Sequence, residues 1–199
     1  KIDADVVVPI PDSGVPAALG FSQTSSIPFE LGLIRNHYVG RTFIEPTQSI
    51  RQFGVKLKHS VNVSYIKNKK VILIDDSIVR GTTAKKIVKM VYDAGAKEVH
   101  LGVSCPPITH PDFYGIDTPN YDELIASNKN IDEMSSIIGT KSLFFLSLDG
   151  TYRAMGCEER DSSSPQFTDH CFTGEYPTPL IDMEQGNVSK QYSLLTEKS

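Results

Sequence analysis

Short apolar runs recur along the chain, each bounded by polar residues or turn formers. They are rich in β-branched and aromatic residues and, with their flanking residues, span six to nine positions, which is typical of strands buried in a sheet. The strongest begins with two lysines, continues with four apolar residues and ends in two acids. The runs predict strands at 4–10, 28–34, 69–76, 96–104 and 142–147.

Between two of these runs, apolar residues recur at helical spacing instead. Ala84, Ile87, Val88 and Val91 follow the i, i+3, i+4, i+7 pattern of one helix face, and Gly95 stands where a C-terminal cap glycine belongs. Further helices are expected at 15–25, with Pro16 in its first turn, and at 121–127 and 131–139.

A strand, a helix and a second strand in succession predict a right-handed crossover and a parallel pairing. The fold expected is therefore α/β, with a mostly parallel open sheet flanked by helices. From Gly156 onward the pattern fades, and residues 181–199 are expected to form a C-terminal tail beyond a domain at 1–180.

The segment 35–65 shows no sustained period and is long for a connection without structure. The pattern alone supports two interpretations equally: a solvent-exposed loop, or a basic lid over an anionic substrate. Its basic residues are Arg35, Arg41, Arg51, Lys56 and Lys58.

Composition narrows the class of protein. The formal net charge of −4 argues against a nucleic-acid surface, and no apolar run approaches the roughly 20 residues that cross a bilayer. The three cysteines are far apart and form no CxxC, which favours a reducing compartment such as the cytoplasm. The chain begins at Lys1 and enters a strand almost at once, so we expect a piece of a longer polypeptide or a processed form.

Polar loops follow two of the predicted strands. In open α/β sheets ligands bind outside the carboxyl ends of the strands, so "PDSG" and "DDSIVRGTT" are expected to meet in one crevice. The second loop leads into a helix N-terminus, where unpaired N–H groups and the helix dipole attract anions. Gly81 allows close approach and the hydroxyls of Ser77, Thr82 and Thr83 add donors, so a phosphate monoester suits this loop.

Asp75 and Asp76 repel a phosphate but accept hydrogen bonds from sugar hydroxyls and attract Mg²⁺. Two other interpretations remain: solvated acids that cap a helix, and a receiver-type phospho-acceptor. The second explains the acids but not the glycine and threonines that follow.

The segment "VILIDDSIVRGTT", residues 71–83, closely resembles the signature of type I phosphoribosyltransferases, which bind phosphoribosyl pyrophosphate. Together with "NHYVGRTFI", "FYGIDTP", "ELIAS" and "CFTGEYPT", it resembles the amidophosphoribosyltransferase family, which acts first in purine synthesis. The resemblance implies that ammonia displaces pyrophosphate from phosphoribosyl pyrophosphate to give phosphoribosylamine. A regulatory module that senses the same ligand or nucleotides is the alternative.

The resemblance also implies roles. Asp75 and Asp76 would accept hydrogen bonds from the ribose hydroxyls and, together with Ser13, would hold Mg²⁺. Arg41, Tyr38 and Lys58 would act in a flexible lid over the pyrophosphate and the ammonia path, with Ile44 beside that path. Arg35 would bind the substrate at the start of this lid. The pyrophosphate would contact Asp12, Ser13 and Gly14, and the 5-phosphate would contact Ser77, Ile78, Val79, Arg80, Gly81, Thr82 and Thr83.

Several features depart from the family. Its glutaminase domain is missing before Lys1, so the chain is expected to use ammonia. His37 and His59 replace usual residues and receive no role. Positions that bind an iron–sulfur cluster in some members are Asp112, Thr168 and Cys171, so no cluster is expected. The family further implies homo-oligomers and inhibition by purine nucleotides.

Overall fold

A parallel sheet of four strands forms the centre of the computed structural model, which describes residues 2–36, 59–116 and 118–180. Its strands follow the order β1-β4-β5-β6, and each neighbouring pair is parallel. The strands are β1 (Val6–Pro9), β4 (Lys70–Asp75), β5 (Glu98–Val103) and β6 (Ser142–Phe145). The expected α/β fold with a mostly parallel sheet is confirmed.

The register brings the carboxyl ends of all four strands to one edge. Pro9 pairs with Ile74 at that edge, Asp75 with Val103, and Val103 with Phe145. The loops that follow β1 and β4 therefore leave the sheet side by side, as the sequence predicts for "PDSG" and "DDSIVRGTT".

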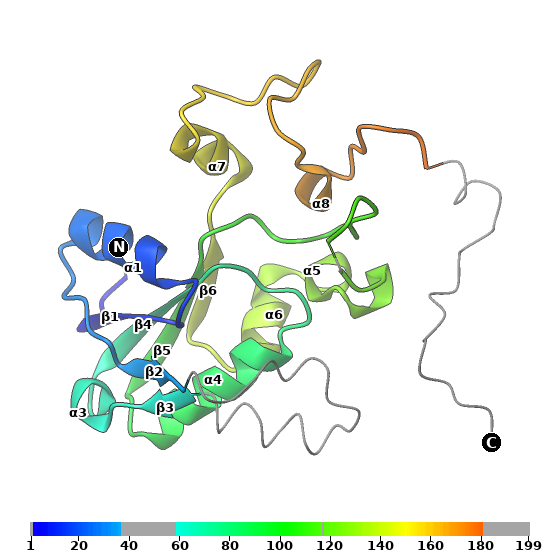
Figure 1. Ribbon diagram of the computed structural model, residues 1–199. Coiled ribbons are helices and arrows are strands. Elements are labelled where there is room, and N and C mark those ends of the chain that lie inside the picture. Colours follow the sequence, from blue (N-terminus) through cyan, green and yellow to red (C-terminus); the bar gives the residue numbers. More distant parts are fainter. Residues whose placement is uncertain (1, 37–58, 117, 181–199) are drawn as a thin grey trace, which may run out of the picture.

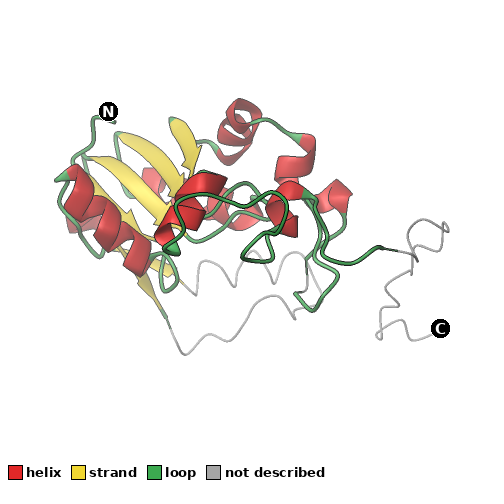
Figure 2. Ribbon diagram, turned by 90° about the horizontal axis from the view of Figure 1, so that it is seen from above, coloured by secondary structure: helices red, strands yellow, loops and turns green. Residues whose placement is uncertain are grey.

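Helices cover both faces of the sheet (Figure 2). On one face α1 (Val15–Ser25) packs through Ala18 against a cluster that includes Ile72 and Ile74. The other face is covered by α4 (Thr82–Asp93) and α6 (Ile131–Ile138), which pack against the alternate strand residues. Burial on both faces explains why β4 is apolar at consecutive positions rather than at every second one.

The described residues also form a second sheet of two strands, which the sequence does not predict. β2 (Leu33–Arg35) pairs antiparallel with β3 (His59–Val61), and α3 (Val63–Ile66) follows. The segment expected to be a loop at 35–65 thus contains a strand and a helix in its described part, and His59 is buried. The strand expected at 28–34 is also shorter: Phe29 makes only an isolated parallel bridge to Val7.

Further short helices lie in the described part of the chain after β5 (Figure 1). They are η2 (Tyr121–Glu123), α5 (Ile125–Asn128), α7 (Leu148–Ala154) and α8 (His170–Thr173). The helix expected at 121–127 is therefore divided in two, and α6 confirms the one at 131–139. α7 was not predicted, and α8 lies where the sequence pattern fades. Within the described residues, no helix is long and apolar enough to cross a membrane. The tail expected at 181–199 lies outside the described residues.

Candidate functional site

The two adjacent acids at the end of β4 occupy different surroundings. Asp75 is the last residue of the strand and is only 8% exposed, whereas Asp76 is exposed. The Asp76 N–H donates to Asp75 Oδ1 at 2.9 Å, and Ser104 donates to the Asp75 carbonyl through its N–H (2.9 Å) and Oγ (3.1 Å). Ser104, in the loop after β5, thus holds the end of β4, and Asp76 faces solvent.

Burial and nearby acids favour the neutral forms of Asp75 and of the neighbouring thiol of Cys105. Burial, followed by the effect of Asp76, raises the pKa of Asp75 to about 8. Burial and the same two acids raise the pKa of the nearby Cys105 thiol to about 12. Cys105 is therefore a protonated thiol at neutral pH and is not activated as a nucleophile.

The loop between β4 and α4 presents a row of free backbone donors. None of the N–H groups from Ser77 to Thr83 donates to another described residue. Ile78 is 3% exposed and anchors the loop in the core, while Thr82 and Thr83 are exposed at the start of α4. Gly81 has φ +72°, a conformation that side chains other than glycine rarely adopt. Free N–H groups at the N-terminus of a twelve-residue helix suit an anion such as a phosphate.

The loop after β1 packs directly against the end of β4. The Ile10 N–H donates to the Ile74 carbonyl at 2.8 Å. A Cβ atom on Gly14 would lie 2.3 Å from the same carbonyl oxygen, so only glycine fits there. Asp12 and Ser13 are exposed on this loop, next to the loop that carries Asp76.

Arg35 brings a positive charge to the first loop. It ends β2, and its Nη1 donates to Asp12 Oδ2 at 2.6 Å. The predicted residues Asp12 and Arg35, which are 23 positions apart, are therefore in contact. His37, Tyr38, Arg41, Ile44 and Lys58 lie outside the described residues.

Two residues that contact the second loop had no predicted role. Arg80 Nε donates to Glu123 Oε2 at 2.6 Å, and the Ile125 N–H donates to the Val79 carbonyl at 3.0 Å. Both partners belong to "ELIAS", which supported the family resemblance only. The contact joins residues 43 positions apart, so no local pattern could reveal it.

Asp112, His170 and Cys171 form a cluster whose potential ligand atoms lie within 4.8 Å of one another. The carboxylate is already fully used: Oδ1 accepts from the N–H groups of 114, 115 and 116 at 2.8–2.9 Å, and Oδ2 contacts His170 Nε2 at 2.7 Å. Burial opposes ionisation, but these hydrogen bonds hold the pKa of Asp112 below its usual value. The geometry is that of a hydrogen-bonded pair joining two distant segments.

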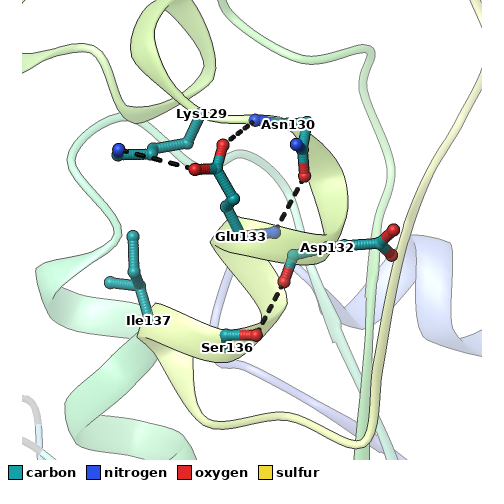
Figure 3. A pocket seen from close by; sticks show the side chains of 6 residues that line it. All are labelled: Lys129, Asn130, Asp132, Glu133, Ser136 and Ile137. Atoms are coloured by element: carbon teal, nitrogen blue, oxygen red, sulfur yellow. Dashed lines mark hydrogen bonds and ion pairs between the residues drawn. The ribbon is translucent and has the colours of Figure 1, made fainter.

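A surface hollow of about 470 Å³ lies at the beginning of α6, apart from the two loops (Figure 3). Its polar groups largely satisfy one another: Asn130 and Glu133 form a reciprocal capping box, and Lys129 lies 3.6 Å from Glu133. The hollow therefore offers few free groups to a ligand. Its lining is Lys129, Asn130, Asp132, Glu133, Ser136 and Ile137.

Comparisons with known proteins agree on one family. Residues 1–132 match the phosphoribosyl transferase domain. The amidophosphoribosyltransferase of Rhizobium etli is 60% identical over 195 residues, which is 98% of this chain and 39% of that protein. That of Bacillus subtilis is 49% identical over 90% of this chain and 37% of its own.

A solved structure is similar as well. The B. subtilis glutamine phosphoribosylpyrophosphate amidotransferase, complexed with ADP and GMP, superimposes with a TM-score of 0.78 at 49% identity. The match covers 89% of this chain and 39% of that one. The chain thus spans about two fifths of the length of these relatives.

Proposed function

Since the chain belongs to the phosphoribosyl transferase domain family, we propose that it is the phosphoribosyltransferase part of an amidophosphoribosyltransferase. It converts phosphoribosyl pyrophosphate and ammonia to phosphoribosylamine and pyrophosphate, the first step of purine synthesis. One observation carries the proposal: a row of free N–H donors directly follows two acids at the carboxyl end of β4.

Each part of this arrangement suits one part of the substrate. The exposed Asp76 and the buried Asp75 accept hydrogen bonds from the ribose hydroxyls, and the 77–83 loop holds the 5-phosphate. Asp12, Ser13 and Gly14 contact the pyrophosphate with Arg35, whose guanidinium is already at the first loop. Ile78 acts through its N–H only, because its side chain is buried in the core.

Mg²⁺ is the metal expected here, and the donor set fits it. Asp75, Asp76 and Ser13 offer oxygen atoms, which hard cations prefer. Burial raises the pKa of Asp75 to about 8, and a cation held beside this carboxyl group would favour loss of its proton. Bound Mg²⁺ supplies positive charge that offsets the charge developing on pyrophosphate.

The residues of the chain act by holding and shielding the reacting groups. Ammonia forms a bond to the anomeric carbon while that carbon's bond to the pyrophosphate oxygen breaks, so the sugar becomes cation-like between the two. Arg41 and Lys58 stabilise the leaving group and Tyr38 helps to exclude water, which competes with ammonia.

The proposed function also implies partners for this chain. We propose that a glutaminase domain, outside this chain, delivers ammonia from glutamine. Purine nucleotides inhibit at the same site, a proposal supported by the ADP and GMP bound to the B. subtilis relative. We further propose a homo-oligomer in the cytoplasm, and the three free cysteines are compatible with that reducing compartment.

An iron–sulfur cluster is not part of the proposal. Asp112 stands at one of the positions that would bind it, and both of its oxygens are engaged by hydrogen bonds. Thr168 stands at another, and a hydroxyl is a poor ligand for such a cluster. Cys171 alone remains as a thiol.

Pyrophosphate release from phosphoribosyl pyrophosphate and Mg²⁺, measured with and without ammonia, tests the proposed reaction. We expect release that rises with ammonia concentration. Binding of the substrate without release would favour the regulatory module instead. If the chain neither bound phosphoribosyl pyrophosphate nor released pyrophosphate from it, the assignment of this loop to phosphoribosyl pyrophosphate would be refuted.

A further inference from the structure

We infer that Glu123 is a positioning residue for the phosphate loop, and that the segment 121–128, formed by η2 and α5, is the support that holds this loop in its ligand-ready shape. The inference rests on the proposed function, because it concerns how the same loop binds a phosphate. It adds a residue from a distant part of the chain to the site.

The support contacts the loop through both backbone and side chain. The Ile125 N–H donates to the Val79 carbonyl at 3.0 Å, and Glu123 accepts from Arg80 Nε at 2.6 Å. The Val79 carbonyl and the Arg80 N–H belong to one planar trans peptide unit, so they point in opposite directions. With the carbonyl held toward Ile125, the Arg80 N–H must face away from the support, and it donates to no described residue.

The next residue of the loop is held by packing. Gly81 lies against the Ile125 side chain, since a Cβ at Gly81 would be 3.0 Å from Ile125 Cδ1. Leu124 and Ile125 are themselves 0% and 9% exposed. Residues 79, 80 and 81 are therefore each fixed by a neighbour from the same short segment.

The segment 121–128 is anchored independently of the loop, which a support requires. Ser127 Oγ donates to the Thr109 carbonyl, which ties the segment to the chain after β5. Within the segment, the Asn128 side chain donates to the carbonyls of Tyr121 (2.8 Å) and Leu124 (3.0 Å) and so holds its shape. On the other side the Tyr121 ring meets the His110 ring edge-on at 5.7 Å. The helix α5 also lies beside α6 (Figure 1).

The Arg80–Glu123 pair itself is exposed, with side chains 44% and 54% accessible. Exposed ion pairs contribute little to global stability. An effect of Glu123 on phosphate binding would therefore come from the orientation of the loop, and a variant at this position should still fold.

Isothermal titration with two probes separates this role from a general effect. Ribose 5-phosphate reports on the 77–83 loop, and pyrophosphate with Mg²⁺ reports on the 10–14 loop. We expect Glu123→Lys, which repels Arg80, to weaken ribose 5-phosphate binding by roughly tenfold, and Glu123→Gln to weaken it by roughly threefold. Both should leave pyrophosphate binding within about twofold.

The matched control is Asp93→Asn, which removes another exposed ion pair, to Lys89 at 2.8 Å on α4. It should leave both affinities unchanged, and the melting temperatures of all three variants should stay within about 2 °C of the wild type. Unchanged ribose 5-phosphate binding in Glu123→Lys, or an equal loss for both probes, overturns the role of Glu123 while the proposed function stands. A wild-type chain that binds neither probe overturns the proposed function, and this inference with it.

Discussion

Asp75 and Asp76 are neighbours in the sequence but differ in their surroundings. Asp75 ends a strand whose last five residues are buried, and its pKa is raised to about 8, whereas Asp76 faces solvent. The sequence predicts that both acids lie at the mouth of a strand. It does not predict their difference, because that depends on the backbone contacts of Ser104 and on burial by distant residues.

The substitution Gly14→Ala tests how tightly the two loops must pack. We expect Gly14→Ala to destabilise the chain by at least about 2 kcal/mol, because its Cβ would lie 2.3 Å from the Ile74 carbonyl and the backbone would have to shift. Urea unfolding measures this free energy. The control is Gly20→Ala on α1, where no atom lies within 4 Å, which should stabilise the chain by about 0.5–1 kcal/mol. Equal effects of the two changes would show that the close contact is unimportant.

At the scale of elements, the segments with their own apolar pattern are predicted from the sequence, including the four-residue strands β1 and β6, whereas β3, α3, α7 and α8 are not. β4, α4 and β5 carry their own apolar pattern, so their residues alone indicate the strand–helix–strand unit. β3 has three residues and forms only because β2 pairs with it. The same holds for the candidate site. The residues 75–83 are one continuous segment that the sequence reveals by itself, whereas Glu123 reaches this segment only through a contact between residues far apart in the chain.

Helices α7 and α8 illustrate why the C-terminal part escaped prediction. Asp169, immediately before α8, accepts from Tyr152 of α7 at 2.8 Å and from Arg160 at 2.5 Å. The side chains of Arg160 and Asp169 are only 10% and 6% exposed. These short helices are thus held by a buried polar network rather than by a local apolar period.

This network predicts a pH-dependent stability. Burial opposes ionisation of Asp169, but Arg160 and Tyr152 hold its pKa below the ordinary value of 3.8. A depressed pKa in the folded state contributes stability above the unfolded pKa, and this stability is lost as the pH falls through the folded value. We expect Asp169→Asn to cost about 3 kcal/mol at neutral pH. The difference from wild type should shrink below about pH 4.

Urea unfolding at several pH values measures this difference. Asp149→Asn, which changes an exposed acid on α7, serves as the control and should alter the free energy of unfolding by no more than about 0.5 kcal/mol. A cost for Asp169→Asn that is independent of pH would argue against an ionised Asp169 in the folded chain.

At the scale of the whole molecule, the Asp112–His170 pair joins the segment after β5 to α8 across 58 positions. The resemblance places a ligand of the iron–sulfur cluster at the position of Asp112. In this chain both oxygens of Asp112 are instead engaged in hydrogen bonds that join the two segments. We expect protein purified anaerobically to contain neither iron nor acid-labile sulfide in stoichiometric amounts. One cluster per chain in that analysis would refute this expectation.

The central claim is that the end of β4 and the loop after it bind phosphoribosyl pyrophosphate. Calorimetric titration of this ligand with Mg²⁺ into the wild-type chain and into Asp75→Asn/Asp76→Asn tests it most directly, with Asp93→Asn as the control. The account predicts that the double variant loses affinity by at least about a hundredfold, because charged acceptors for the ribose hydroxyls and the metal disappear. An affinity equal to that of the wild type would contradict it.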